Sequence, residues 1–306
     1  MDPSLLIVER PGDAPLDGGD VSEVAPAAHT RGKPPLSERV RRDYTVFEPG
    51  RDGSLTGFGL FVYNLLYWPY LLTTCALFFV PALVIFAFTA PFDPRRRALH
   101  WYTCLWGAHY LAWAPYAGVR VEGREHARAA GPCIFVSNHQ SMVDILAVFA
   151  LRMPFLWVSK VENFYVPFLG WNMWLNRYVP LRRGYLPSIM RMVRTCHARL
   201  REGHSLFVFP EGTRSPTGNL IAFYPGAFRI AVRNQVPIVP VVVDGTQVIL
   251  PKKQLFIRPC PVVMRILPPV YPASVGNDHK RLLQEVRTRM QHELDVMRGA
   301  DIASNS

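Results

Sequence analysis

The chain has 306 residues, 49% of them hydrophobic, which is enough to bury one sizeable core and to carry a further segment. Its net charge is +11, and because residues 1–30 carry −5 the remainder carries +16, a balance that suits anionic lipids, phosphorylated substrates or nucleic acid. The five cysteines show no paired spacing, which argues against a small disulfide-stapled secreted fold and favours reduced thiols facing a cytosolic compartment.

The N-terminal residues 1–57 are rich in Pro, Gly, Asp and Ala and poor in large apolar side chains. Such a segment cannot bury enough surface to offset the conformational entropy that folding removes. We therefore predict a disordered tail. Its start has no basic region followed by an apolar stretch, so we expect no secretory signal.

An uncharged apolar stretch of 33 residues follows at 58–90, and a second stretch without Asp, Glu, Lys or Arg runs over 98–119. The first exceeds the ~18 residues that indicate membrane insertion. As one helix it is about 50 Å long against a ~30 Å hydrocarbon core, so we expect a tilt, or a break at Pro69 or Pro81. The sequence thus predicts membrane-anchoring helical segments over residues 58–118.

Two arrangements of these segments are open. If both span the bilayer, the arginines at 95–97 lie across the membrane from the rest of the chain, against the positive-inside tendency. If they form a shallow helical hairpin in one leaflet, every basic cluster stays on the cytosolic side. We favour the hairpin, with Trp101, Trp106 and Tyr110 of its second helix at the headgroup level, where such rings are common.

Short apolar runs separated by helical patterns begin at residue 119. The expected strands are 119–121, 133–136, 155–158, 178–181, 206–209, 238–243 and 262–266. Helices are expected over 185–202 and over 278–298, where an apolar stripe begins at Leu283. This alternation predicts an α/β domain over residues 119–306, with a mixed, largely parallel sheet flanked by helices and ligands bound at strand ends.

A histidine and a carboxylate, His139 and Asp144, follow the expected strand 133–136. Five positions of a regular helix turn about 500°, so the two side chains meet only if the chain bends between them. Ser141 and Asp144 form a capping-box pattern, which supplies the bend by making Ser141 the N-cap of a helix. A histidine held by a carboxylate suits a general base. The plainer alternative is that Asp144 only caps the helix and His139 is a loop histidine.

The loop after the strand 206–209 combines an acid, a flexible backbone and a fixed positive charge in Glu211, Gly212, Thr213 and Arg214. A guanidinium can bind a phosphate with two parallel hydrogen bonds, and a glycine lets the backbone come close. The loop therefore predicts an anion site.

These stretches resemble the motifs of a known family. The runs Asn-His-Gln-Ser-Met-Val-Asp at 138–144, Phe-Pro-Glu-Gly-Thr-Arg-Ser at 209–215 and Val-Pro-Ile-Val-Pro-Val at 236–241 are similar, in this order, to those of glycerolipid acyltransferases of the 1-acylglycerol-3-phosphate type. The resemblance covers roughly residues 119–270. It implies that Lys160 contacts a phosphate and that Arg183 binds glycerol phosphate. Arg177 and Arg182 depart from the family pattern, so the headgroup stays open.

The resemblance implies transfer of an acyl group to the sn-2 hydroxyl of 1-acyl-glycerol-3-phosphate (lysophosphatidic acid), giving phosphatidic acid. The cosubstrate would be an acyl thioester, either acyl-CoA or acyl-acyl carrier protein, with no bound cofactor. No metal is expected, because a lone His-x4-Asp lacks a third ligand. The expected location is an anionic membrane surface, with the active site facing the cytoplasm (the inner membrane if the source is bacterial).

In this reading His139 is the general base and Asp144 its partner. Lys160, Arg183 and Arg214 hold the phosphate, and Glu211 orients the glycerol hydroxyl. Backbone N–H groups at Ser141 or Met142 are the expected donors to the oxyanion.

Two other functions stay open. A related enzyme would acylate a lysolipid with a different headgroup. A non-catalytic membrane protein would bind anionic lipid through the same basic loops, and it predicts that His139→Ala leaves all function intact. Nucleic acid is the least favoured partner, because the positive charge lies in separate loops beside apolar segments and no binding module is recognised. The sequence does not predict the oligomeric state.

Overall fold

The structure is a computed structural model that describes residues 57–113, 119–258 and 260–299. The tail predicted over 1–57 lies outside these residues except for Gly57, which begins the first helix.

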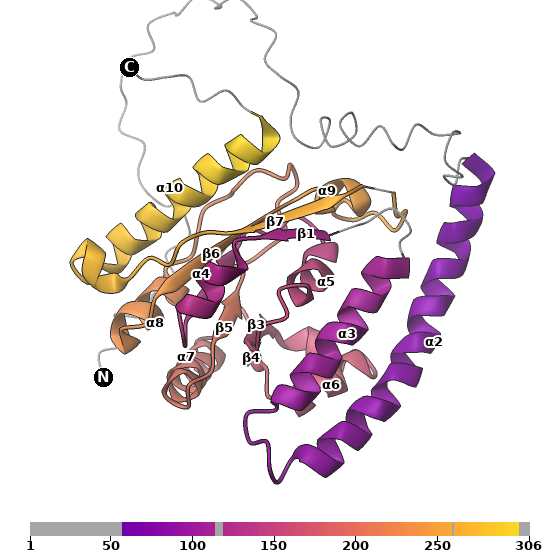
Figure 1. The fold of residues 1–306 in the computed structure, drawn as a ribbon, viewed down its shortest axis with the longest axis horizontal. Helices are drawn as coiled ribbons and strands as arrows, with labels where there is room; N and C mark the ends of the chain where they lie inside the picture. The colour runs from indigo at the N-terminus through magenta and orange to yellow at the C-terminus, as the bar shows by residue number, and fades with distance from the viewer. Residues whose placement is uncertain (1–56, 114–118, 259, 300–306) are drawn as a thin grey trace, which may run out of the picture.

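Seven strands form one sheet with the order β1-β7-β6-β2-β5-β3-β4 (Figure 1). Every neighbouring pair is parallel except β6 and β7. This confirms the prediction of a mixed, largely parallel sheet. The strands are β1 Val119–Glu122, β2 Ile134–Ser137, β3 Leu156–Lys160, β4 Val179–Leu181, β5 Leu206–Val208, β6 Ile238–Asp244 and β7 Val262–Ile266.

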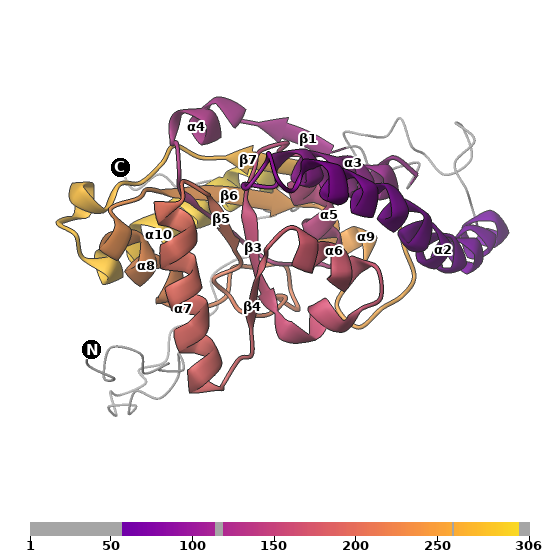
Figure 2. The same cartoon turned by 90° about the horizontal axis from the view of Figure 1, so that it is seen from below.

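Helices connect the strands, as parallel neighbours require. They fall into two groups that lie at opposite ends of the molecule in Figures 1 and 2, with α7, α8 and α10 in one and α2, α3, α5 and α6 in the other. The helices are α2 Gly57–Thr89, α3 Arg97–Trp113, α4 Arg124–Ala129, α5 Val143–Phe149, α6 Leu169–Leu175, α7 Leu186–Arg201, α8 Gly226–Asn234, α9 Thr246–Ile249 and α10 His279–Arg298, with 3₁₀ turns η3 Val161–Tyr165 and η4 Pro272–Val275.

Both helices predicted from apolar stripes are present. In α10 the buried stripe begins at Leu282 rather than Leu283, which is only partly buried. The Asp278 side chain accepts hydrogen bonds from the N–H groups of Lys280 and Arg281 at the start of this helix, and Gly299 ends it in the left-handed conformation, as a C-cap glycine commonly does.

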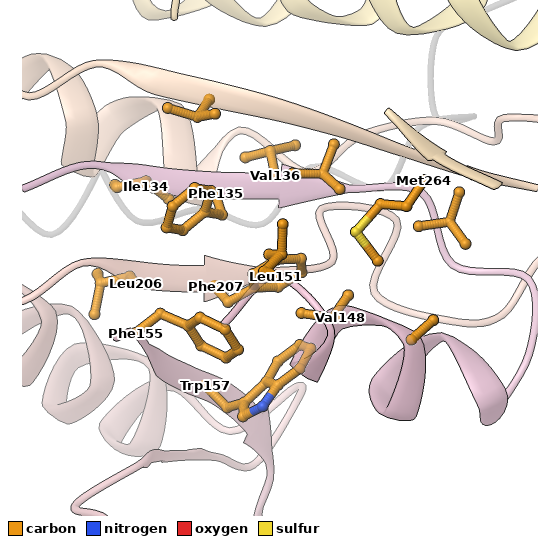
Figure 3. Close-up of a cluster of buried hydrophobic side chains, with 14 of the residues drawn as sticks. Ile134, Phe135, Val136, Val148, Leu151, Phe155, Trp157, Leu206, Phe207 and Met264 are labelled. Carbon is orange, nitrogen blue, oxygen red and sulfur yellow. The ribbon is translucent and has the colours of Figure 1, made fainter. Parts of the chain in front are cut away.

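Aromatic side chains fill the core under the middle of the sheet (Figure 3). The Phe207 ring of β5 packs between Phe135 of β2 and Trp157 of β3, with ring centroids 5.9 Å and 4.5 Å away. All four residues of β2 are buried. The carboxyl ends of these strands therefore project from a rigid base.

The apolar N-terminal segment is one continuous helix, α2, which runs through Pro69 and Pro81 without the break that either proline could have caused. Within the described residues it is the one helix long and apolar enough to cross a membrane by length and composition. It forms a hairpin with α3.

Helix α3 packs on α5 of the α/β domain instead of lying wholly in lipid. It contacts α5 so closely that a Cβ on Gly107 would lie 2.5 Å from Cδ2 of Phe149. Trp106 and Tyr110, expected at the headgroup level, are buried, whereas Trp101 is exposed. The expectation for these two rings was wrong, because the face of α3 that carries them covers protein.

Candidate active site

The sheet order places every predicted site residue beyond the carboxyl ends of neighbouring strands. The strands β2, β5, β3 and β4 are consecutive and parallel, so their carboxyl ends meet there. His139 follows β2, the 211–214 loop follows β5, Lys160 ends β3 and Arg183 follows β4. Ligands of open α/β sheets bind just outside the carboxyl ends of the strands.

The predicted His–Asp pair is formed. Nδ1 of His139 lies 2.8 Å from Oδ2 of Asp144, a fully buried carboxylate. The same Oδ2 accepts the N–H groups of Gln140 (2.6 Å) and Ser141 (2.8 Å), and Oδ1 accepts the hydroxyl of Thr246. Since this carboxylate only accepts hydrogen bonds here, Nδ1 carries the imidazole proton and Nε2 is left as the basic nitrogen.

The bend between the two residues differs in detail from the predicted capping box. Helix α5 begins at Val143, and its N-cap is Met142 rather than Ser141. The Ser141 hydroxyl accepts the N–H of Val143 (3.2 Å), one residue earlier than in the box. Asp144 does reach back to the Ser141 N–H, so half of the predicted pattern is present. That bond also occupies one of the two N–H groups expected to hold an oxyanion.

The imidazole ring of His139 is held by stacking as well as by Asp144. It lies parallel to the Phe209 ring, with centroids 4.0 Å apart and planes 12° apart. Phe209 stacks in turn on Trp157, at 5.4 Å. The His139 side chain keeps 13% of its surface exposed, so one part of the ring is accessible.

Hydrogen bonds join the two sequence motifs directly. The His139 N–H donates to Oε1 of Glu211 (3.2 Å), and the His139 carbonyl accepts the N–H of Ser215 (2.7 Å). Gly212 between these partners has φ +65, and a Cβ there would lie 2.8 Å from the Tyr224 ring. The loop therefore needs glycine at this position.

Glu211 is a buried acid with an unusual charge state. Burial raises the pKa of its carboxyl to about 8, and the nearby charge of Asp144 acts in the same direction, against the hydrogen bond from His139. Its Oε2 is buried with no hydrogen-bond partner among the described residues. At neutral pH the carboxyl is therefore mostly protonated.

The predicted phosphate ligands are less closely grouped. Lys160 pairs with Glu162 at 3.2 Å, and Arg183 is exposed. Strands stand about 4.8 Å apart, so β4 lies about 14 Å from β2. In the part of the chain that the structure describes, no hydrogen bond joins Lys160 or Arg183 to the His139 loop. Arg214 is nearer, because its own loop bonds to His139.

Part of this sequence is shared with a known protein family. Residues 118–244 match the model of the family described as Acyltransferase. Residues 118–244 belong to the acyltransferase family. All eight predicted site residues lie inside this acyltransferase domain, whereas the α2–α3 hairpin lies outside it.

Relatives of this acyltransferase domain share one name. The chain is 36% identical over 208 residues to a 1-acyl-sn-glycerol-3-phosphate acyltransferase of Chlamydomonas reinhardtii, covering 66% of this chain and 61% of the relative. It is 37% identical to a chloroplastic one of Arabidopsis thaliana, covering 54% and 46%. The chain thus spans about half to three fifths of the length of these curated relatives.

A solved structure extends the likeness beyond residues 118–244. The crystal structure of the 1-acyl-sn-glycerophosphate (LPA) acyltransferase PlsC from Thermotoga maritima superposes with a TM-score of 0.66 and 26% sequence identity. It covers 78% of this chain and 97% of its own. The fold is therefore shared well beyond the acyltransferase domain.

Sequence reasoning missed the residues that support the histidine loop from a distance. Asn138 forms two 2.8 Å hydrogen bonds with the backbone of Val243, and Nε2 of Gln140 donates to the Val243 carbonyl and to Asp244. Asp244 is buried and paired with Arg298, at 2.8 Å. The last turn of α10 thus supports the loop that carries His139.

Thr246→Val tests one of these supports. The hydroxyl donates to the buried Oδ1 of Asp144, and valine keeps the shape without the donor. We expect urea-induced unfolding to show a loss of about 1–3 kcal/mol, the cost of a buried polar group left unpaired. The control is Thr195→Val, whose hydroxyl bonds its own helix on the surface. Equal stability of both variants would contradict a structural role for Thr246.

Proposed function

We propose that this protein transfers an acyl group from an acyl thioester to the sn-2 hydroxyl of 1-acyl-glycerol-3-phosphate, giving phosphatidic acid. The observation that carries the proposal is the His139 side chain, whose Nδ1 bonds Asp144 while Nε2 has no hydrogen bond from any of the described residues. His139 follows the carboxyl end of β2, where ligands of such sheets bind. The names of the relatives supply the substrate class. The thioester is carried by coenzyme A or by acyl carrier protein.

In the proposed reaction, Nε2 of His139 removes the proton of the sn-2 hydroxyl as its oxygen attacks the thioester carbonyl. Asp144 stabilises the imidazolium that forms, and its bonds to Gln140, Ser141 and Thr246 keep it in place. The Ser141 N–H is already bonded, which leaves the N–H of Met142 to stabilise the oxyanion. Collapse of the tetrahedral intermediate breaks the C–S bond and expels the thiolate, which takes up the proton from His139 and leaves as the thiol.

The acceptor phosphate is proposed to lie over the 211–214 loop. Arg214 supplies a guanidinium, and Lys160 and Arg183 add positive charge from the neighbouring strands. Glu211, mostly protonated at neutral pH, is proposed to orient the glycerol hydroxyl. The Lys252 ammonium bonds the Arg214 carbonyl (2.7 Å) and the Thr213 hydroxyl (3.3 Å), which orders the loop before substrate arrives.

We further propose a three-part organisation, with a tail over 1–57, an anchor over 58–118 and a catalytic domain over 119–306. The exposed apolar surface of α2 supports membrane association. The packing of α3 on α5 favours a hairpin held beside the domain over two independent spans. The site would face the cytoplasm.

Arg214→Ala tests the acceptor. With lysophosphatidic acid and an acyl thioester in detergent micelles, we expect KM for lysophosphatidic acid to rise about 10- to 100-fold, since a charge-assisted pair to phosphate is lost. Arg194→Ala, an exposed arginine of α7, should leave KM unchanged. If the wild type ignores lysophosphatidic acid but acylates lysophosphatidylcholine, the headgroup assignment is wrong and the proposed chemistry stands.

A further inference from the structure

Large apolar side chains lie exposed on the segment that joins β3 to β4, outside the α2–α3 hairpin. Five of them stand within ten residues, each between 43% and 74% exposed. We call this set the η3–α6 surface. It consists of Tyr165, Val166, Leu169, Trp171 and Trp174.

Helix α6 shows the reverse of the usual inside–outside pattern. It buries the amides of Asn172 and Asn176, both of which donate to the Thr103 hydroxyl of α3 at 3.1 Å. Its outward face carries Trp171 and Trp174. The buried amides fix the helix to α3, while about half of the surface of each indole-bearing residue stays exposed, which costs free energy in water. An outward face of this kind fits a less polar surrounding than water.

The η3–α6 surface continues into the candidate membrane helix. The Phe79 ring of α2 contacts the rings of Phe168 and Trp171, at centroid distances of 5.9 Å and 5.5 Å. Two α2 side chains within two positions of Phe79, those of Leu77 and Val80, are themselves exposed. Figures 1 and 2 both show α6 beside α2. One apolar surface therefore extends from α2 onto the domain.

Charge around this surface is positive. Between residues 160 and 183 the chain has four basic residues and one acid, Glu162. Lys160 lies directly before η3, and Arg182 and Arg183 follow β4, which contacts η3. Basic side chains beside Trp and Tyr are the composition of a protein surface at anionic headgroups. A second copy of the chain would instead bring these like charges together.

We infer that the η3–α6 surface docks into the headgroup region of an anionic bilayer, as a second membrane contact beside α2. The contact places the carboxyl ends of β3 and β4 at the lipid surface, so a lysolipid can reach the site without leaving the membrane. The inference concerns how the domain lies on the membrane, and it holds whether or not the protein transfers an acyl group.

The test uses the full chain in vesicles of phosphatidylcholine and phosphatidylglycerol. Tyr165→Cys and its control Tyr271→Cys each carry a nitrobenzoxadiazole label, in a Cys75→Ser background because the other four cysteines are buried. Tyr271 is exposed directly ahead of η4, and its neighbour Val270 bridges Ile238 at the start of β6, the end of that strand away from the site. We expect iodide in the water to quench the label at 165 several-fold less than at 271. Headgroup-labelled lipid should quench only the label at 165.

Three outcomes overturn the inference. The first is equal iodide quenching at 165 and 271, and Trp174→Cys repeats the comparison in case Tyr165→Cys folds poorly. The second is protection that appears only as the protein-to-lipid ratio rises, which means that another protein covers the surface. The third is equal protection in vesicles of phosphatidylcholine alone, which removes the role assigned to the basic residues.

Discussion

His139→Ala is expected to lower kcat/KM for phosphatidic acid formation about 10³-fold, because a positioned general base contributes on the order of 10²–10⁴. The stability of the variant should stay close to that of the wild type. Asp144 keeps its bonds from Gln140, Ser141 and Thr246 when the imidazole is gone, so its carboxylate stays compensated. Steady-state kinetics with lysophosphatidic acid, together with thermal unfolding, measures both effects.

His292→Ala is the matched control, since His292 is an exposed histidine of α10 far along the chain from the site. Asp144→Asn adds a second comparison, in which the imidazole loses its acceptor on Nδ1 and with it the tautomer that frees Nε2. A protein that only binds anionic lipid predicts equal behaviour of His139→Ala and wild type. Undiminished acyl transfer by His139→Ala would remove the histidine from the mechanism.

The sheet and the His–Asp pair could be predicted because their signals are local. Strands β2 and β6 are fully buried runs of mainly apolar residues, and buried strands of largely parallel sheets have this pattern. The spacing of His139 and Asp144 across the start of a helix requires a bend, and the two residues lie within one loop. Both could be predicted without knowing which distant segments of the chain lie beside them.

Residues that act across the sheet could not be predicted in this way. Thr246 bonds Asp144 from 102 positions away, and Arg298 reaches Asp244 from the last helix. The first depends on β6 lying beside β2 and the second on α10 packing against β6, and a single sequence reveals neither. The same limit explains the errors at Trp106 and Tyr110. Their aromatic character fits an interfacial helix equally well until α2 is seen to pack on that face, where Phe78 contacts both rings.

Glu211→Gln is expected to change how stability depends on pH. The carboxyl titrates near 4.5 when unfolded and at about 8 when folded, so between these values the folded chain holds a proton that the unfolded chain releases. The free energy of unfolding of the wild type therefore falls as pH rises through this window. Glutamine cannot ionise, yet it still offers an oxygen to the His139 N–H. The variant should be more stable than the wild type near pH 8 by a few kcal/mol, at roughly 1.4 kcal/mol for each unit of pKa difference.

Urea-induced unfolding in detergent at both ends of the window measures this effect. Near pH 4.5 both proteins carry an uncharged side chain at 211, so their stabilities should converge there. Glu125→Gln, which changes an exposed acid of α4, should leave the pH dependence as it is in the wild type. Parallel curves for Glu211→Gln and wild type would show that the buried carboxyl is ionised at neutral pH. Glu211 would then accept hydrogen bonds from the acceptor substrate instead of donating one, and the glycerol hydroxyl would bind with its proton directed toward this residue.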